Sequence, residues 1–420
     1  MKVNYKRNVT YNTAKYPIRQ PRFFTWLIYV LCKMLLKGKQ YKIEKINMEG
    51  LKPPYLILSN HQHFMDFKLA GIATYPHRVN NVVNLDGYYH MGWLMELIGA
   101  IATRKFSMDL HLIKSIKKVL KRGDVCCIYP EARYTPIGTT AMLPESLGKI
   151  VKMMKVPLVT TVHRGNYLYS PFWDFRRKRK VPFHTTLTQT LTAEQIEQMS
   201  VEEINEVIKK ALEYDEYRYQ KENGILITEP FRAEGLHKVL YQCPHCKTES
   251  KMDSKGSEIF CTECGKRWNL NEDGSLSALE GETEFSHIPD WFEWERSEVR
   301  KQIDSGEYVF EDEVDLYTLP SWKKFYSIGK AKLRHDAENG FIVEGSYRNK
   351  DFRLVRKPLE SIGLHVEYDH THFIPLDCFD ISTEEDSYFC YPSKKDVITK
   401  LSFAVEEAYK KKKEELDENK

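Results

Sequence analysis

The strongest constraint on the fold is the alternation of short apolar runs with helical patterns between residues 55 and 220. Runs such as "YLILSN", "VNNVVNL" and "DVCCIYP" are typical of strands, whereas "SMDLHLIKSIKKVLKRG" repeats apolar residues at helical spacing and ends at Gly123. This alternation predicts an α/β domain whose central sheet is flanked by helices. Reactive side chains in such domains usually follow the carboxyl ends of strands.

The 420 residues are enough for two or three domains, each with its own core. We expect a basic N-terminal segment at 1–44, the α/β domain at 45–235, a small cysteine-rich ribbon at 236–285, an acidic linker helix at 286–317 and a β-rich α+β domain at 318–420. The last domain alternates apolar and polar residues in short runs and ends in a helix, in shape like a pleckstrin-homology sandwich.

The charge of the chain is divided unevenly along its length. Residues 1–190 carry 31 Lys and Arg against 10 Asp and Glu, whereas the remainder carries 32 against 49. The first part should therefore prefer an anionic partner. Five consecutive cations in "DFRRKRKV", residues 174–181, follow several aromatic residues and suit anionic lipid or an acidic carrier protein. Nucleic acid is the alternative partner for this basic region, and we favour the anionic lipid or acidic carrier protein over it.

The apolar stretch "FFTWLIYVLCKMLL", residues 23–36, is interrupted by Lys33 and is shorter than the roughly 20 residues that span a bilayer. We interpret it as a helix in the membrane interface, with Trp26 and Tyr29 at headgroup level and flanking cations on anionic lipid. The alternative is an ordinary core helix. The first interpretation predicts a cytoplasmic protein attached peripherally to the cytoplasmic face of the membrane.

Residues that could take part in catalysis or substrate binding follow or begin several of the predicted strands. They are His61 and Asp66 in "NHQHFMD", Arg104 in "GAIATR", Glu131 and Arg133 in "YPEARYT", and Pro157 in "VPLVTTVHRG". A base, a carboxylate that orients it and two guanidiniums suit the deprotonation of a hydroxyl on a phosphate-bearing substrate, which then attacks an activated acyl group. Taken singly, each residue could equally be part of a structural ion pair.

In this order and spacing, the four motifs resemble the glycerolipid acyltransferase family, whose best-known members acylate lysophosphatidic acid. The resemblance covers roughly residues 45–220. It implies that His61 is the catalytic base and Asp66 its orienting partner, and that Arg104, Glu131, Arg133 and Pro157 belong to the acceptor pocket. The third motif departs from the family pattern, because Ala132 stands where Gly is usual.

The spacing within the first motif poses a geometric problem. On a continuous helix, residues three apart such as His63 and Asp66 differ by about 60° in direction, and residues five apart such as His61 and Asp66 by about 140°. His61 can meet Asp66 if the chain turns around Asn60 and a helix starts just after. We therefore expect a turn there, with His61 as the base and His63 at the rim.

The implied mechanism is direct transfer from acyl-CoA or acyl carrier protein to the hydroxyl of a lysophospholipid, most simply 1-acyl-sn-glycerol-3-phosphate. His61 takes the hydroxyl proton while Asp66 stabilises the imidazolium. Backbone amides near the first motif are the expected donors to the oxyanion. Cys126 and Cys127 lie in an apolar strand without an adjacent base, so we interpret them as structural thiols.

Four cysteines form two Cys-x-x-Cys pairs in "CPHCKTESKMDSKGSEIFCTEC", namely Cys243, Cys246, Cys261 and Cys264. Fourteen residues separate the pairs, a spacing typical of a zinc ribbon with a closed structural Zn²⁺ site. Disulfides are the alternative, which the odd total of nine cysteines disfavours.

Two functions from different classes fit these observations. The first is a membrane-associated acyltransferase with accessory domains. The second is a non-catalytic lipid-binding adaptor that keeps the same fold and uses the zinc ribbon as an interaction module. The joint presence of His61, Asp66, Glu131 and Arg133 favours the enzyme, because a scaffold has no physical need of these four residues.

Overall fold

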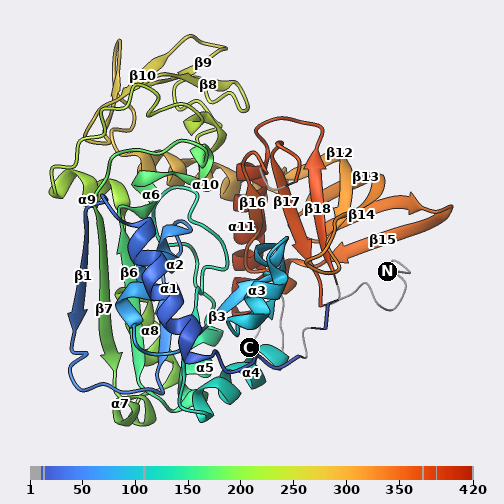
Figure 1. Cartoon of the computed structure of the whole chain (residues 1–420). Coiled ribbons are helices and arrows are strands. Elements are labelled where there is room, and N and C mark those ends of the chain that lie inside the picture. Colours follow the sequence, from blue (N-terminus) through green and yellow to red (C-terminus); the bar gives the residue numbers. More distant parts are fainter. Residues whose placement is uncertain (1–10, 13–14, 107–109, 371–372, 385, 419–420) are drawn as a thin grey trace. The chain divides into compact units, whose positions relative to one another are not determined.

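The computed structural model describes residues 11–420 except 13–14, 107–109, 371–372, 385 and 419–420. The described chain forms two compact units. The first unit contains residues 11–171 and 178–219, and the second contains residues 172–177 and 220–420. Each unit has its own sheets (Figure 1).

The first unit alternates strands and helices as the sequence predicts. Its elements are α1 (Arg22–Leu35), β1 (Tyr41–Ile46), β2 (Leu56–Ser59), α2 (Met65–Thr74), β3 (Val79–Asn84), η1 (Leu85–Tyr88), α3 (Gly92–Leu97), β4 (Ile101–Thr103), α4 (Leu110–Lys121), β5 (Val125–Ile128), α5 (Ser146–Met154), β6 (Leu158–Arg164), α6 (Asn166–Tyr169), β7 (Phe183–Leu191), α7 (Ala193–Gln198) and α8 (Val201–Ala211), followed by the start of α9 (Glu216–Glu222).

The strands of the first unit form one seven-stranded mixed sheet in the order β1-β7-β6-β2-β5-β3-β4 (Figure 1). All neighbouring pairs are parallel except β6 and β7. The central strand β2 lies between β5 and β6, so the loops that follow these three strands leave the sheet at one edge.

Both faces of this sheet are covered, which explains why its central strands are apolar throughout. In β2, Leu56 and Leu58 point to a core that α4, α5, α7 and α8 complete. Ile57, between them, points to the opposite core with residues of α2. Alternate residues of a strand face opposite sides of the sheet, so each face takes every second side chain. The expected α/β architecture is confirmed.

Helix α1 is apolar on two sides. Its inner side packs on the sheet and α2 through residues such as Ile28 and Cys32, near Gly71. On its outer side Phe23, Trp26 and Met34 are 60%, 48% and 65% exposed. No helix in the described part of the chain is long and apolar enough to cross a bilayer.

The second unit begins with η2 (Phe172–Asp174) and continues from the end of α9. Its further elements are η3 (Leu236–Lys238), β8 (Met252–Lys255), β9 (Glu258–Cys261), β10 (Arg267–Leu270), β11 (Leu276–Ala278), α10 (Ile288–Asp304), β12 (Val309–Thr318), β13 (Tyr326–Asp336), β14 (Gly340–Tyr347), β15 (Lys350–Arg356), η4 (Pro358–Glu360), β16 (His365–Glu367), β17 (Cys378–Ser382), β18 (Ser387–Pro392) and α11 (Ile398–Glu418).

These strands form two antiparallel sheets. The small sheet has the order β11-β10-β9-β8 and carries the cysteine-rich segment. The large sheet has the order β15-β14-β13-β12-β18-β17-β16, and α11 follows its last strand. The expectation of a β-rich region that ends in a helix is confirmed.

Three predicted boundaries need correction. The segment 286–317, expected to be an acidic linker helix, contains α10 but also β12, the strand that joins the two halves of the large sheet. The exposed acidic residues Glu311 and Glu313 of β12 form ion pairs with Arg334 and Lys330 on β13, which balance their charges within the sheet. The α/β domain starts before residue 45, since β1 begins at Tyr41, and it ends before residue 235.

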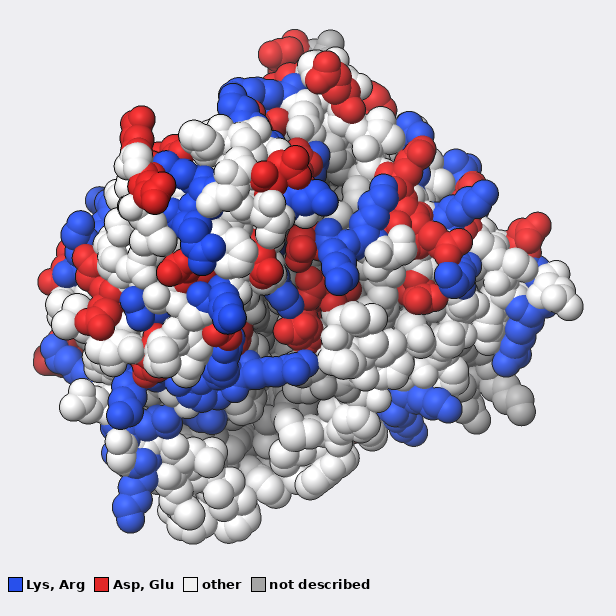
Figure 2. Space-filling model, turned by 90° about the horizontal axis from the view of Figure 1, so that it is seen from above, with Lys and Arg blue, Asp and Glu red and all other residues white. Residues whose placement is uncertain are grey.

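The charged side chains do not form one continuous basic field on the face drawn in Figure 2. Basic and acidic side chains are intermixed over much of that face, and a broad area along its lower edge has few charges. Within the cationic run 176–180, Arg177 pairs with Asp174 and Glu234, and Arg179 is buried. This run is therefore partly internal rather than a free basic surface.

Candidate active site

Three loops that follow neighbouring strands come together at one edge of the mixed sheet. His61 follows β2, Glu131 follows β5 and Asn166 follows β6. Because β5 and β6 both pair with β2 in parallel, these residues lie at the same, carboxyl-terminal edge. This edge is the candidate active site.

The first motif forms a turn that brings His61 and Asp66 together. The chain turns over residues 60–64, and α2 begins at Met65. His61 Nδ1 lies 3.0 Å from Asp66 Oδ2. Asn60 holds the start of this turn, because its side chain exchanges hydrogen bonds with both backbone groups of His163. The turn that the five-residue spacing requires is thus present.

The carboxylate of Asp66 is fully buried and is surrounded by donors. Besides His61, it accepts hydrogen bonds from the backbone amides of Gln62 and His63, at 2.7 and 3.1 Å, and from Asn166 Nδ2 at 2.6 Å. Burial by itself would raise the pKa of Asp66, but the hydrogen bonds from His61 and Asn166 hold it below its ordinary value. An ionised Asp66 keeps the His61 proton on Nδ1 and leaves the lone pair of Nε2 available.

The ring and the backbone of His61 are both held in place. The ring packs on Tyr129 and Tyr134, with centroid distances of 4.2 and 4.4 Å. Its backbone N–H donates to Glu131 Oε1 at 3.2 Å, and its carbonyl accepts from the Thr135 amide at 2.9 Å. The side chain remains 24% exposed. A rigid imidazole that solvent can still reach is suited to general-base chemistry.

Glu131 is buried, and it contacts backbone amides and a tyrosine hydroxyl as well as lying near Arg133. Its carboxyl accepts hydrogen bonds from the amides of His61 and Ala141 and from the hydroxyl of Tyr214, each at 3.2 Å from the nearer oxygen. Burial raises the pKa of Glu131 to about 7, against the lowering effect of these donors and of the nearby Arg133. Glu131 therefore fixes the loop after β5 onto the backbone of His61.

The departure at Ala132 has a visible consequence. This residue has a φ of 55°, in the left-handed region where a Cβ atom costs about 1–2 kcal/mol. Glycine, the usual residue of the family at this position, adopts such a φ without that penalty. The chain thus keeps the backbone conformation that glycine would favour, and the surrounding hydrogen bonds of Glu131 and Thr135 hold it there.

His63 is buried instead of lying at the rim, which corrects the prediction. It is 4% exposed, and its Nδ1 accepts a hydrogen bond from the Met65 amide at 3.1 Å. Burial lowers the pKa of His63 to about 3, so the ring is neutral at physiological pH. Its role is to cap the start of α2.

The backbone amides nearest His61 are already used inside the protein. The amide of His61 donates to Glu131, those of Gln62 and His63 donate to Asp66, and that of Met65 donates to His63. The expectation that amides of the first motif supply the oxyanion donors is therefore wrong for these four groups. Their hydrogen bonds serve to build the turn.

The remaining predicted residues lie at different distances from His61. Arg133 is buried beside Glu131 in the loop after β5. Arg104 follows β4, whose carboxyl end lies three strands from that of β2, or roughly 14 Å at the usual strand spacing. Pro157 precedes β6 and its carbonyl accepts from the Leu56 amide, so it lies at the opposite end of the strands. The structure does not bring Pro157 to the candidate site.

Two residues of the site, Asn166 and Glu216, are not among those that the sequence motifs predict. Asn166 follows Gly165, which has a φ of 81° and where a Cβ atom would lie 2.2 Å from the carbonyl of Pro182. The Gly165 amide donates to Glu216 Oε2 at 2.6 Å, and burial raises the pKa of Glu216 to about 7. The only local signal was a glycine directly after a strand, which predicts a tight turn but not its partners.

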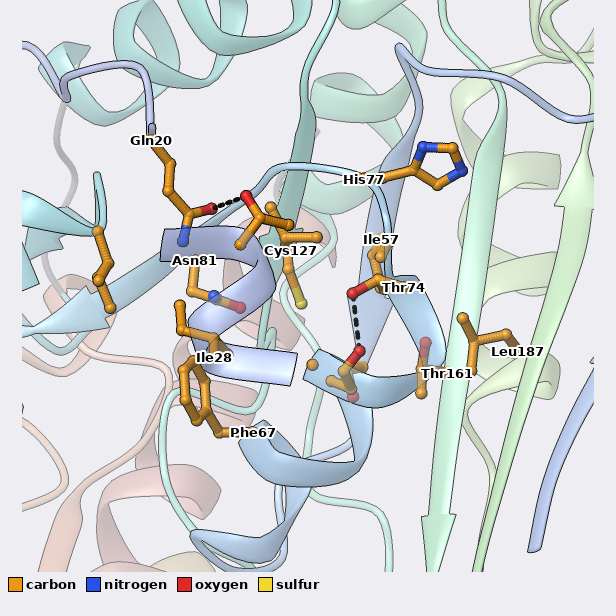
Figure 3. Close-up of a pocket in the computed structure, with 16 residues that line it drawn as sticks. Gln20, Ile28, Ile57, Phe67, Thr74, His77, Asn81, Cys127, Thr161 and Leu187 are labelled. Atoms are coloured by element: carbon orange, nitrogen blue, oxygen red, sulfur yellow. Dashed lines mark hydrogen bonds between the residues drawn. The ribbon is translucent and has the colours of Figure 1, made fainter. Parts of the chain in front are cut away.

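A narrow cavity lies between the sheet and the helices α1 and α2 (Figure 3). Ile28 and Phe67 line it from the helices, and Ile57 and Thr161 from the strands. Its volume of about 40 Å³ is enough to hold an ordered water molecule, and its lining is partly polar. In this form the cavity suits ordered water better than an acyl chain.

A comparison with models of known protein families matches the part of the chain that contains this site. Residues 38–164 match the sequence model of the Acyltransferase family, a segment that contains His61, Asp66, Glu131 and Arg133. The match confirms the resemblance to acyltransferases over these residues. A comparison with curated protein sequences found no match.

Among solved structures, the chain is similar to that of PlsC, the 1-acyl-sn-glycerophosphate (LPA) acyltransferase of Thermotoga maritima. The two chains are 14% identical, and the similarity covers 45% of this chain and 78% of PlsC with a TM-score of 0.38.

The burial of His63 predicts a pH-dependent contribution to stability. Its folded pKa of about 3 lies below the ordinary value of 6.5, so the unfolded chain binds the proton first and stability falls as the pH drops below 6.5. At pH 5 the loss from this group amounts to at most about 2 kcal/mol.

The variant His63→Asn keeps an acceptor for the Met65 amide but cannot take up the proton. Urea unfolding of the full chain at pH 7 and pH 5 should show a smaller loss of unfolding free energy for the variant than for the wild type. Equal losses would mean that His63 is not held neutral by burial.

Proposed function

We propose that this protein is an acyltransferase that transfers a fatty acyl chain from a thioester donor to the hydroxyl of a lysophospholipid. The observation that carries the proposal is the His61–Asp66 pair, with Nδ1 and Oδ2 3.0 Å apart, inside the segment that matches the Acyltransferase family. The pair lies at the sheet edge where reactive groups of α/β domains are usually found.

The proposed reaction is a direct transfer. Nε2 of neutral His61 takes the proton of the acceptor hydroxyl as its oxygen bonds to the thioester carbonyl carbon. The carbon–sulfur bond then breaks, and the leaving thiolate receives the proton from the imidazolium. Asp66 stabilises the imidazolium between these steps, because its carboxylate is ionised and hydrogen-bonded to Nδ1.

A covalent acyl-enzyme is not part of the proposal. Cys126 and Cys127 are buried in β5, and burial raises the pKa of both thiols, that of Cys127 to about 12. A thiol in that environment is a poor nucleophile near neutral pH. The acyl donor in the proposed reaction is acyl-CoA or acyl carrier protein.

The proposed acceptor is a phosphate-bearing lysolipid, most simply 1-acyl-sn-glycerol-3-phosphate. Arg133 supports this choice, because its guanidinium is held beside Glu131 in the loop that also braces His61. A guanidinium can bind phosphate with two parallel hydrogen bonds. We also assign Arg104, a buried residue that follows β4, to a more distant part of the substrate.

Membrane attachment through α1 is the second part of the proposal. The outer side of α1 exposes Phe23, Trp26 and Met34 at helical spacing, and Lys33, Lys37 and Lys39 lie at its C-terminal end. An amphipathic surface of this kind suits a helix that lies in the interface of an anionic bilayer. We place the protein at the cytoplasmic face of the membrane.

The base can be tested by substitution. His61→Ala should lower kcat for transfer of a labelled acyl chain to 1-acylglycerol-3-phosphate by about 10²–10⁴-fold, the usual contribution of a general base. His63→Asn is the matched control and should stay within a few-fold of the wild type. A variant His61→Ala that folds normally and still turns over, or a wild type that binds lysolipid without transfer, would contradict the proposal and favour the adaptor.

Arg133 can be tested by the choice of acceptor. In Arg133→Ala, kcat/KM for 1-acylglycerol-3-phosphate relative to that for neutral 1-acylglycerol should fall by about 10-fold or more, since a hydrogen bond to a charged group contributes about 1.5–3 kcal/mol. Arg133→Lys keeps the charge and should show an intermediate ratio. An equal loss for both acceptors would argue against recognition of phosphate.

Membrane attachment can be tested with the full chain and sedimented vesicles that contain anionic phospholipid. Trp26→Asp should reduce the bound fraction, with a change in partition of about tenfold or more for the lost burial of an aromatic side chain. Leu416→Asp is the control, because Leu416 is similarly exposed but lies on α11. Equal binding by both variants would remove α1 as the attachment surface.

A further inference from the structure

The four cysteines of the small sheet converge although no disulfide joins them. Their sulfur atoms all lie within 4.8 Å of one another. Cys243 Sγ is 3.8 Å from Cys264 Sγ, and Cys246 Sγ is 3.7 Å from Cys261 Sγ. A disulfide would require about 2.05 Å. Four sulfurs around a tetrahedral Zn²⁺ with bonds of about 2.3 Å lie about 3.8 Å apart, which is the spacing of these two pairs.

Each Cys-x-x-Cys pair is folded into a turn that points both sulfurs inward. In the first pair the Lys247 amide donates to the carbonyl of Cys243 at 2.8 Å, and Lys247 has a φ of 62°. In the second pair the Gly265 amide donates to the carbonyl of Cys261 at 3.0 Å, and Gly265 has a φ of 77°. In both turns the residue after the second cysteine donates a hydrogen bond to the carbonyl of the first cysteine, and in both this residue has a positive φ. They therefore form a matched pair of cysteine knuckles around the four sulfur atoms.

The chemistry of the donor set narrows the choice of metal. Four thiolates suit zinc or an iron–sulfur centre, whereas oxygen-binding cations such as Mg²⁺ and Ca²⁺ prefer carboxylates and carbonyls. With four protein ligands there is no open position for a reacting water, so such a site is structural rather than catalytic.

The first knuckle is attached to α10 and not to its own sheet alone. The backbone of Gln242, directly before Cys243, donates to Glu295 Oε1 at 2.7 Å and accepts from Trp291 Nε1 at 3.0 Å. Trp291 in turn packs on Trp268 of β10, with ring centroids 5.0 Å apart. A change in the geometry of this knuckle should therefore disturb both buried indoles.

We propose that Cys243, Cys246, Cys261 and Cys264 bind one Zn²⁺ ion, and that this ion holds the small sheet of the second unit onto α10. Four strands of three or four residues bury too little apolar area for independent stability. The metal supplies the missing constraint. This site is independent of the proposed acyl transfer, since none of its ligands belongs to the first unit.

The experiment measures metal and tryptophan emission on the full chain purified without added metal. Elemental analysis should find about one zinc per chain, and Cys243→Ser with Cys246→Ser should abolish it. Cys390→Ala, which removes a buried cysteine outside the cluster, should leave zinc content unchanged. Removal of zinc with a chelator in mild urea should red-shift the tryptophan emission, and added Zn²⁺ should reverse the shift.

Three results would overturn the proposal: a well-folded wild type with no bound metal, a double variant with unchanged zinc content, or iron with its thiolate absorption in place of zinc. A wild type that binds zinc and shows no change in tryptophan emission on chelation would overturn the coupling to α10. None of these readouts depends on acyltransferase activity.

Discussion

The buried carboxylate of Asp66 is the interaction on which the candidate site depends. A charge that is fully removed from water is stable in a fold only when donors surround it. Here the donors come from two loops: the turn at 61–63 and Asn166 after β6. The need to satisfy one carboxylate therefore shapes the turn that sets the His61 ring and joins it to a strand a hundred residues further along the chain.

A second buried carboxyl, that of Glu131, has a different state and a different task. Asp66 keeps a lowered pKa, because it accepts several hydrogen bonds including that of the His61 ring. The hydrogen bonds to Glu131 are longer, at 3.2–3.3 Å, and burial raises its pKa to about 7. One carboxyl thus holds the tautomer of the His61 ring and the other holds the His61 backbone. In the reaction proposed above, both contacts keep the imidazole in position during proton transfer.

The two sheets of the second unit differ in how much apolar core they can form. Its large sheet can bury an apolar core against α11, but the small sheet β8–β11 consists of short strands. In that sheet the four cysteines converge and Trp268 packs on Trp291. In the proposal made above, a metal ion held by these cysteines adds the stability that a small core lacks.

The sequence by itself determined the strands β2, β5 and β6, the helix α4, the pairing of His61 with Asp66 and the two cysteine knuckles. Each rests on a local pattern of apolar spacing or on a short motif, and local patterns survive into the fold. The tertiary structure alone decided the burial of His63, the position of Pro157 at the far end of the strands, and the contacts of Asn166 and Glu216. It also turned an acidic segment into the strand β12, because partners on β13 balance its charges. These features depend on residues distant in the chain, and no local periodicity records which distant residue will supply a hydrogen bond or cover a side chain.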